Sequence, residues 1–175
     1  MNKTLLCLFV FCLSLGFAAT CHAAAAGIPT NINASRMDYN ADKQIVVFSG
    51  NVHVKRPDFE LWSDLLTVYL ANAGGQEGNQ SMSSMKAGDI SVIVAEHNVI
   101  IKSGTREAQA GKATYTVATD ELKLEGPPTP WLRDKGNTLS AHTIFHYIKA
   151  NKSSFKGAVN ATFFTPEGSS PLPKN

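Results

Sequence analysis

The sequence predicts an all-β domain built from repeated short strands, and three observations support this. Apolar and polar residues alternate with a period of two in several segments, which indicates strands with one dry face and one solvated face. β-Branched residues are concentrated in other segments of strand length. Gly, Pro, Asn and Asp interrupt the chain every 8–15 residues. This spacing is typical of a sandwich, a barrel or a solenoid.

The first 23 residues are expected to be a cleaved signal peptide. Lys3 gives a short positive start, residues 5–17 are apolar except for Ser14, and mostly small residues follow. The apolar run is too short to span a bilayer comfortably, so we expect export and cleavage after Ala23. An uncleaved anchor and a lipoprotein acylated at Cys21 remain as alternatives.

Cysteine usage and charge limit the class of protein. All three cysteines, Cys7, Cys12 and Cys21, lie in the signal segment, so the exported chain holds together by packing without disulfides. Removing Lys3 leaves 15 basic against 14 acidic side chains, which gives no indication of a nucleic-acid partner. One domain is expected over residues 24–164, followed by a flexible tail at 165–175.

The clearest strand is the stretch VVFSGNVHVK. Its alternation places Val46, Phe48, Val52 and Val54 on one dry face. Gly50 lies on the same side, where a glycine permits a bend, a bulge or a close neighbour.

Further strands are expected along the chain. After a turn at Pro57-Asp58, residues 59–64 continue the alternation. Residues 90–94 and 99–102 are rich in β-branched residues, and residues 121–125 alternate cleanly.

The chain also repeats itself. Similar segments end at Tyr39, Tyr69, Tyr115 and Tyr147, and a glycine follows three of these tyrosines after ten or eleven residues. Stacked copies of one small β unit would line a common apolar interior. The last copy, within residues 140–148, also fits helical spacing, but its sister segments favour a strand.

The repeated units carry a family resemblance. The matching stretches are Ala34, Met37-Asp38-Tyr39, Val47-Phe48-Ser49-Gly50-Asn51-Val52-His53-Val54, Ser63-Asp64, Leu66-Thr67-Val68-Tyr69, Gly74-Gly75-Gln76-Glu77-Gly78, Ala113-Thr114-Tyr115, Leu122-Lys123-Leu124-Glu125-Gly126 and Asn137-Thr138-Leu139-Ser140. Together they make the sequence resemble the periplasmic lipopolysaccharide-transport protein A family (LptA, or OstA-like). Three positions depart from the family pattern: His97 stands in place of a glycine, Pro127-Pro128 follows Gly126, and Ala141 replaces a frequent glycine.

The resemblance implies a twisted antiparallel β-jellyroll (OstA-like) with open ends. It further implies a non-enzymatic periplasmic protein that binds lipopolysaccharide through the lipid A acyl chains. Head-to-tail self-association would then form a bridge from the inner to the outer membrane. The partners it implies are an LptC-like inner-membrane protein and an LptD-like outer-membrane protein, without a cofactor.

A lipid carrier needs an apolar lining, because leaving about a dozen CH₂ groups in water costs about 10 kcal/mol. Twelve residues are candidates for this lining, although each could instead belong to a packed core. They are Val46, Phe48, Val52, Val54, Phe59, Leu61, Val92, Val94, Val99, Ile101, Leu122 and Leu124.

The first and last strands are candidates for partner contacts. Residues 32–37 carry only Arg36, and residues 157–164 carry no charge. Uncharged edge strands are prone to pair with another chain. The candidate contacts are Ile32, Ala34, Val159, Ala161 and Phe163. An internally paired or disordered terminus is the alternative.

Metal and catalytic sites have weaker support. His142 and His146 share a face and, with His53 or His97, suggest a metal site, but nothing completes a known motif and no metal is expected. Glu60 and Asp64 offer a carboxylate pair for glycoside hydrolysis. Asp64 more simply ends a strand by binding local backbone N–H groups.

Aromatic and basic residues leave further alternatives. Trp131 either caps an open end of the groove or packs a loop against the core. Six cations either meet lipid phosphates or are simply solvated. They are Arg36, Lys55, Arg56, Arg106, Arg133 and Lys135.

The leading interpretation is therefore a non-enzymatic lipopolysaccharide-transport protein. One alternative is a membrane-anchored LptC-like component, which requires residues 5–17 to remain as an anchor. Others are a structural β-filament or envelope scaffold that binds no lipid, and an envelope glycan hydrolase.

Overall fold

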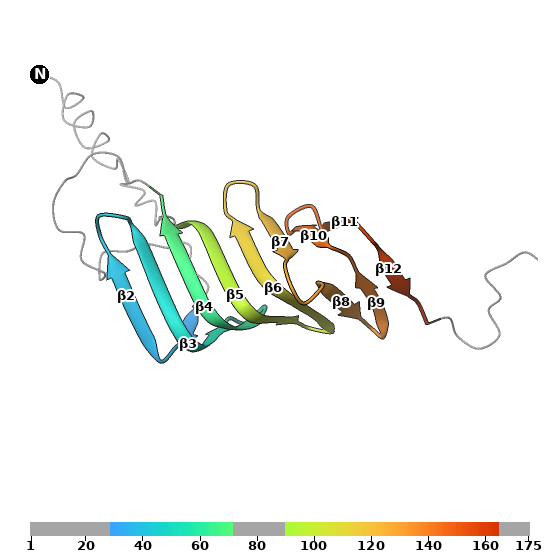
Figure 1. Cartoon of the computed structure of the whole chain (residues 1–175), viewed down its shortest axis with the longest axis horizontal. Coiled ribbons are helices and arrows are strands. Elements are labelled where there is room, and N and C mark those ends of the chain that lie inside the picture. The colour runs from blue at the N-terminus through green and yellow to red at the C-terminus, as the bar shows by residue number, and fades with distance from the viewer. Residues whose placement is uncertain (1–28, 72–89, 165–175) are drawn as a thin grey trace, which may run out of the picture.

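The structure is a computed structural model that describes residues 29–71 and 90–164, and all its regular elements are strands (Figure 1). Twelve strands form one antiparallel sheet that does not close on itself. The strands are β1 (Asn31–Asn33), β2 (Arg36–Asn40), β3 (Ile45–Lys55), β4 (Glu60–Leu70), β5 (Ile90–Ser103), β6 (Arg106–Thr116), β7 (Glu121–Glu125), β8 (Trp131–Asp134), β9 (Asn137–Ser140), β10 (Thr143–Tyr147), β11 (Lys152–Lys156) and β12 (Asn160–Thr162). The prediction of an all-β antiparallel fold with open ends is confirmed.

The twelve strands make up eight bent strands. β3 to β6 each run through a bend, whereas the pairs β1–β2, β7–β8, β9–β10 and β11–β12 are each interrupted there. Each bent strand contributes one segment to each of two half-sheets. The first half-sheet contains β1, β8, β9, β12 and residues 52–55, 60–63, 99–103 and 106–110; the second contains β2, β7, β10, β11 and residues 45–49, 65–70, 90–96 and 112–116.

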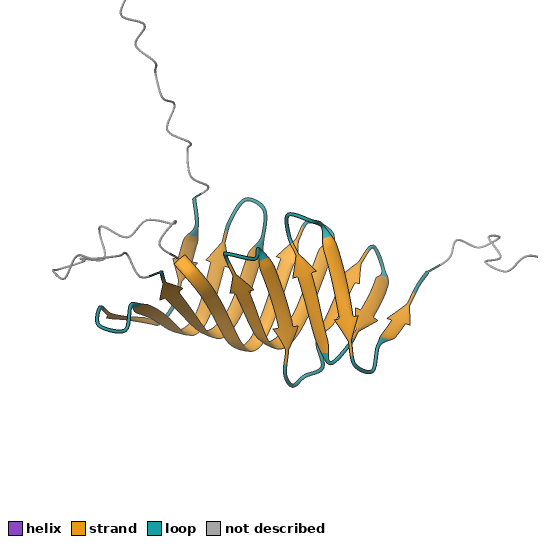
Figure 2. Cartoon of the chain, turned by 90° about the horizontal axis from the view of Figure 1, so that it is seen from above, coloured by secondary structure: helices purple, strands orange, loops and turns teal. Residues whose placement is uncertain are grey.

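The bent strands follow one another in chain order, so the two sheet edges lie at opposite ends of the molecule (Figure 1). Seen from above, the strands form two layers that cross along this length (Figure 2). Within the described residues, no helix is long and apolar enough to cross a membrane.

The line of bends, which we call the corner, uses residues that tolerate a left-handed backbone. β3 has Gly50 (φ 77°) and Asn51 (φ 49°) there, and β5 has His97 (φ 62°) and Asn98 (φ 53°). Each pair forms a bulge, because the register with the neighbouring strands shifts at these positions. His97-Asn98 therefore takes the same backbone conformation as Gly50-Asn51, despite the missing glycine.

The bulges decide which side chains face inward. In β3 the extra residue preserves the alternation, so Phe48 and Val52 both face the interior. β4 has no extra residue, and its buried positions change parity at Asp64, from Leu61 to Leu66. β6 changes parity in the same way at Gly111.

The core lies along the corner and joins the two half-sheets. Val52 and Val99 from the first half-sheet, and Leu66, Leu124 and Ile144 from the second, are almost completely buried in one cluster. Ile144 belongs to strand β10, which confirms the strand prediction for this segment. Several neighbours in the cluster are alanines, which allow close approach of the facing strands: Ala95, Ala108, Ala110, Ala113 and Ala141.

Candidate functional site

The inner faces of the two half-sheets together form an apolar interior. Moving away from the corner, the first half-sheet continues with Val54, Leu61 and Ile101, which are cross-strand neighbours. The second continues with Ile93 and Leu122, which both lie beside Tyr115. Burial decreases in this direction, so the interior has a closed floor along the corner and partly exposed walls.

The structure brings together nine of the twelve predicted lining residues. Five are buried in the core cluster and form the floor: Val52, Val54, Leu61, Val99 and Leu124. Four are partly exposed and pack against this cluster as walls: Phe48, Phe59, Ile101 and Leu122. Val46 is buried on the same inner face, where it lies opposite Val68.

The remaining two predictions, Val92 and Val94, have the wrong orientation. They pair with Tyr69 and Thr67, which lie on the outer face of the second half-sheet. The inward residues of this segment are Ile93 and Ala95. The sequence suggested two separate strands here, whereas β5 is one continuous strand whose bulge keeps Ile93 in phase with Val99.

Several inward residues were missed by the sequence interpretation. The alanines are too small to give a strong apolar pattern. In β4 the inward positions change parity at Asp64, so the alternation before Asp64 does not predict the inward residues after it. The missed residues include Leu66, Val68, Ile93, Ala95, Ala108, Ala110, Ala113, Ala141 and Ile144.

Each edge of the sheet consists of two short strands, whereas the sequence analysis expected one strand at each edge. The N-terminal edge consists of two strands, β1 and β2, separated at residues 34–35. The C-terminal edge consists of β11 and β12, so it includes the charged residues Lys152 and Lys156 as well as the uncharged segment.

The five candidate edge contacts lie at these two edges. Ile32 pairs with Val54 and is half-buried, and Ala34 is exposed at the corner. Ala161 is exposed in β12, while Val159 and Phe163 beside it are 51% and 64% exposed. The C-terminal edge therefore presents apolar side chains to the exterior.

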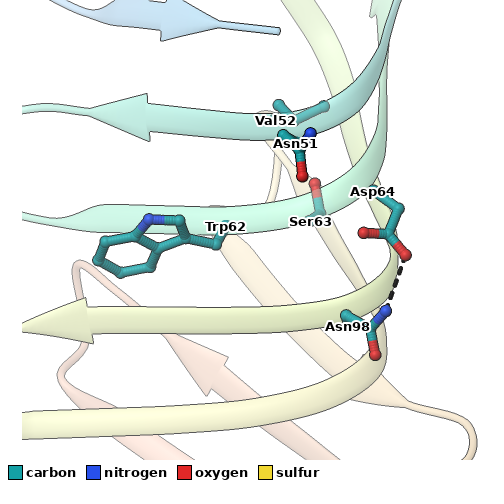
Figure 3. A pocket seen from close by; sticks show the side chains of 6 residues that line it. All are labelled: Asn51, Val52, Trp62, Ser63, Asp64 and Asn98. Atoms are coloured by element: carbon teal, nitrogen blue, oxygen red, sulfur yellow. Dashed lines mark hydrogen bonds between the residues drawn. The ribbon is translucent and has the colours of Figure 1, made fainter. Parts of the chain in front are cut away.

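A pocket of about 210 Å³ opens at the corner (Figure 3). The Asn98 side-chain amide donates a 2.8 Å hydrogen bond to Asp64. Nearby, the buried Ser63 Oγ has no hydrogen-bond partner among the described residues. The pocket is lined by Asn51, Val52, Trp62, Ser63, Asp64 and Asn98.

The candidate carboxylate pair is not assembled into a hydrolytic site. Asp64 lies inside β4 and binds Asn98, so the prediction that it ends a strand through backbone contacts is wrong. Glu60 instead accepts a 2.9 Å hydrogen bond from His53, whose ring stacks on Trp62 with 4.8 Å between centroids. The hydrogen bond to His53 lowers the pKa of Glu60, despite the opposing effect of burial.

The histidines are separated in the structure. His142 lies beside Gly157, and it borders a second pocket of about 470 Å³ formed with residues 126–130. His146 lies on the inner face, where its Nδ1 is 3.0 Å from Ser153 Oγ. Within the described ranges, no group of three or more His, Cys, Asp or Glu side chains could hold a metal ion.

Trp131 occupies neither of its two predicted positions. It is the first residue of β8, which lies between β6 and β9 in the first half-sheet, with Gln109 and Ser140 as cross-strand neighbours. Its Nε1 donates a 3.0 Å hydrogen bond to Gln109, and Arg133 lies 5.0 Å over its ring. Because the next residue, Leu132, faces the core, Trp131 belongs to the outer face.

Asp120 lies in the β6–β7 turn, at the end of the second half-sheet away from the corner, and forms hydrogen bonds there. Its carboxylate accepts hydrogen bonds from Tyr115 Oη at 2.5 Å and from the backbone N–H of Lys149 at 2.7 Å. Burial, followed by the hydrogen bond to Asp120, raises the pKa of Tyr115 to about 12. The hydrogen bond from Tyr115 in turn lowers the pKa of Asp120. Asp120 thereby links the β6–β7 turn to the β10–β11 turn.

Comparison with known proteins supports the same architecture. A search of curated proteins gives no match. Among solved structures, LptH from Pseudomonas aeruginosa is similar, with a TM-score of 0.62 and 13% identity over 79% of this chain and 96% of that one. LptH is described as the LptA homologous periplasmic component of the conserved lipopolysaccharide transport device. At this identity, the likeness supports the fold.

A family model described as "LptA/(LptD N-terminal domain) LPS transport protein" matches residues 31–152. This range begins with β1 and reaches the first residue of β11, so it includes both half-sheets except for most of β11 and all of β12. The chain therefore belongs to the LptA/(LptD N-terminal domain) family of lipopolysaccharide transport proteins.

Proposed function

We propose that this protein is a periplasmic carrier that holds the acyl chains of lipopolysaccharide between its two half-sheets and stacks head to tail into a bridge. Its partners at the ends of the bridge would be an LptC-like inner-membrane protein and an LptD-like outer-membrane protein. The main supporting observation is the apolar interior, whose walls stay partly exposed.

The graded burial of this interior suits a lipid. The floor residues Val52 and Val99 are 1% and 0% exposed, so other protein atoms already cover their apolar surface. Phe59, Ile101 and Leu122 retain exposed apolar surface that an acyl chain would cover. Each buried CH₂ group contributes about 0.8 kcal/mol, so a chain of about a dozen carbons is retained strongly without any catalytic group.

The geometry of the edges supports stacking. Neighbouring bent strands are antiparallel, and their number is even, so the first and the last run in opposite directions. Each edge has one three-residue and one five-residue strand: β1 and β2 at one end, β12 and β11 at the other. Placing β11 beside β2 and β12 beside β1 would continue both half-sheets into the next copy. Such a head-to-tail contact produces an open filament.

Photo-crosslinking at two adjacent isoleucines tests the lipid path. Ile101 packs against the core on the inner face, whereas Ile100 lies beside Trp62 on the outer face, and both are half-buried. A photo-reactive amino acid at position 101 is expected to give lipopolysaccharide adducts in cells, and the same residue at position 100 is expected to give none. Adducts at neither position in a folded protein would instead favour the lipid-free scaffold.

The membrane-anchored LptC-like alternative depends on residues 5–17, which lie outside the described residues together with the proposed cleavage site. N-terminal sequencing of the exported protein separates the two possibilities. A start at Ala24 supports the free carrier, and an intact N-terminus supports the anchored component.

A further inference from the structure

The two half-sheets divide the six candidate cations into different environments. Lys55 and Arg133 lie on the outer face, because they alternate with the inward residues Val54 and Leu132. Arg36 is bound to Asp38 at the N-terminal edge, and Lys135 lies in the β8–β9 turn. The remaining two, Arg56 and Arg106, lie on the inner side.

The register and packing place these two arginines at the open side of the interior. Arg106 pairs with Ser103 and is two residues from Ala108, which faces the core. The Arg56 guanidinium lies 5.1 Å over the ring of Phe59, which packs against the core cluster. Both arginines therefore lie beyond the apolar walls of the first half-sheet.

Two polar residues of the second half-sheet face them. Tyr115 and His146 are both cross-strand neighbours of the inward Leu122. Burial lowers the pKa of His146, and the positive charge of Arg106 lowers it further. The charge of Arg56 likewise acts on Tyr115, where it opposes the increase in pKa. We call these four residues, Arg56, Arg106, Tyr115 and His146, the mouth of the interior.

Within the part of the chain that the structure describes, Arg106 uses only part of its hydrogen-bonding capacity. It reaches Asp134 through Nε alone, at 3.4 Å, and its side chain is 50% exposed. Asp134 also accepts a 2.8 Å hydrogen bond from Thr105, and this bond is the main reason that its pKa is lowered. The carboxylate would thus keep a donor if Arg106 turned to another anion.

Arg56 is held more firmly. Its Nε and Nη2 bind the two oxygens of Asp58 at 2.9 and 3.1 Å, and its side chain is 30% exposed. Arg56 therefore contributes a fixed positive charge to the mouth, whereas Arg106 keeps donors that have no partner among the described residues.

We infer that the mouth is a subsite for the phosphorylated headgroup of the bound lipid, with Arg106 as the direct contact and Arg56 as a supporting charge. This inference rests on the proposed function, because acyl chains between the half-sheets would leave the headgroup at the mouth. A guanidinium binds phosphate oxygens through two parallel N–H donors, which gives both affinity and orientation.

Binding of two lipid probes to the full exported chain tests the inference. Phosphorylated lipid A is expected to bind about tenfold more tightly than dephosphorylated lipid A, which is the size of one charge-assisted hydrogen bond. Arg106→Gln is expected to remove this preference while binding of the dephosphorylated probe is unchanged. Arg106→Lys should retain part of the preference, because it keeps the charge and loses the planar fork.

Arg133→Gln is the matched control, since it removes an arginine from the outer face of the same half-sheet. It should leave the tenfold preference intact. Equal binding of both probes by the unmodified protein, or an unchanged preference in Arg106→Gln, would overturn the headgroup assignment and leave the lipid path standing.

Two further outcomes separate the remaining explanations. Inorganic phosphate alone is expected not to bind measurably; binding as tight as that of the lipid would indicate a site for free phosphate and overturn the headgroup assignment. If the unmodified protein binds neither lipid, the proposed function fails, and the inference that rests on it fails with it.

Discussion

Gly50 lies so close to Ser35 at the corner that a Cβ atom at position 50 would meet the Cβ and Oγ atoms of Ser35 at 2.9 Å. The backbone N–H of Ser35 donates a 2.8 Å hydrogen bond to the Gly50 carbonyl. Gly50 also has a φ of 77°, a conformation that other residues rarely adopt. The first bent strand is thus fastened to β3 at a position where only glycine fits.

Substitution of this glycine is therefore expected to destabilise the fold. Gly50→Ala should lower the free energy of unfolding by about 2–4 kcal/mol, from the strained backbone together with the steric contact. Gly104→Ala is the control, because Gly104 has a φ of 57° with nothing within 4 Å of its would-be Cβ. It should cost about 1 kcal/mol in the same urea unfolding experiment. Equal losses would show that the approach to Ser35 is unimportant.

The difference between floor and wall residues is expected to appear in stability. Leu124 is 2% exposed in the core cluster, whereas Leu122, two residues earlier on the same face, is partly exposed. Leu124→Ala should cost about 3 kcal/mol, and Leu122→Ala about 1 kcal/mol, because the second change leaves no closed cavity. Urea unfolding of both variants measures this. A larger loss for Leu122→Ala would place the floor of the interior elsewhere.

The Asp120 carboxylate is expected to make stability fall in acid. Its pKa is lowered in the folded protein, first by the Tyr115 hydrogen bond, so its contribution is present above the unfolded pKa of about 3.9. The contribution is lost as the pH falls through the folded pKa. Asp120→Asn should therefore be less stable than the unmodified protein at pH 7, and the gap should close in acid. Unfolding curves at pH 7, 5 and 3 would contradict this if the gap stayed constant.

Tyr115 predicts a matching loss at the alkaline end. Its pKa is raised to about 12. Its contribution is therefore complete below the unfolded value of about 10 and disappears as the pH rises through 12. The pKa of Tyr147 is also raised, first by its hydrogen bond to Glu121, so ultraviolet titration should show more than one late tyrosinate transition. Tyr115→Phe should remove the transition near pH 12. If Tyr115→Phe removes a transition near pH 10 instead, the hydrogen bond to Asp120 does not form as described.

Charges at the C-terminal edge are expected to prevent stacking. Val159→Asp and Phe163→Asp place a carboxylate on side chains that are already 51% and 64% exposed, so the fold should tolerate both. Analytical ultracentrifugation should show a concentration-dependent assembly that either substitution shifts toward the monomer.

Ile148→Asp provides the control for this edge. Ile148 is 48% exposed but lies in the turn between β10 and β11. It should leave the assembly unchanged. An equal effect of all three substitutions would argue against an edge contact.

The sequence by itself determined the strand type of most segments and the inner face of β3. Alternation at Phe48 and Val52 was sufficient there, because the bulge at Gly50-Asn51 inserts the residue that preserves the pattern across the bend. The repeated units also carried the family resemblance. The units that begin at Ala34, Ala110 and Ser140 each form one hairpin of the second half-sheet: β2 with residues 45–49, residues 112–116 with β7, and β10 with β11.

Only the tertiary structure decided the facing of β4 and β5. A period of two is a local property, whereas the effect of a bend depends on whether the strand carries an extra residue relative to its neighbours, which only the cross-strand register shows. Leu66 could not be assigned without knowing that β4 bends at Asp64, and Val92 was misassigned because β5 continues through His97-Asn98. The cross-strand register also places Arg106 on the inner face and Arg133 on the outer face. The local sequence around each arginine does not distinguish these two positions.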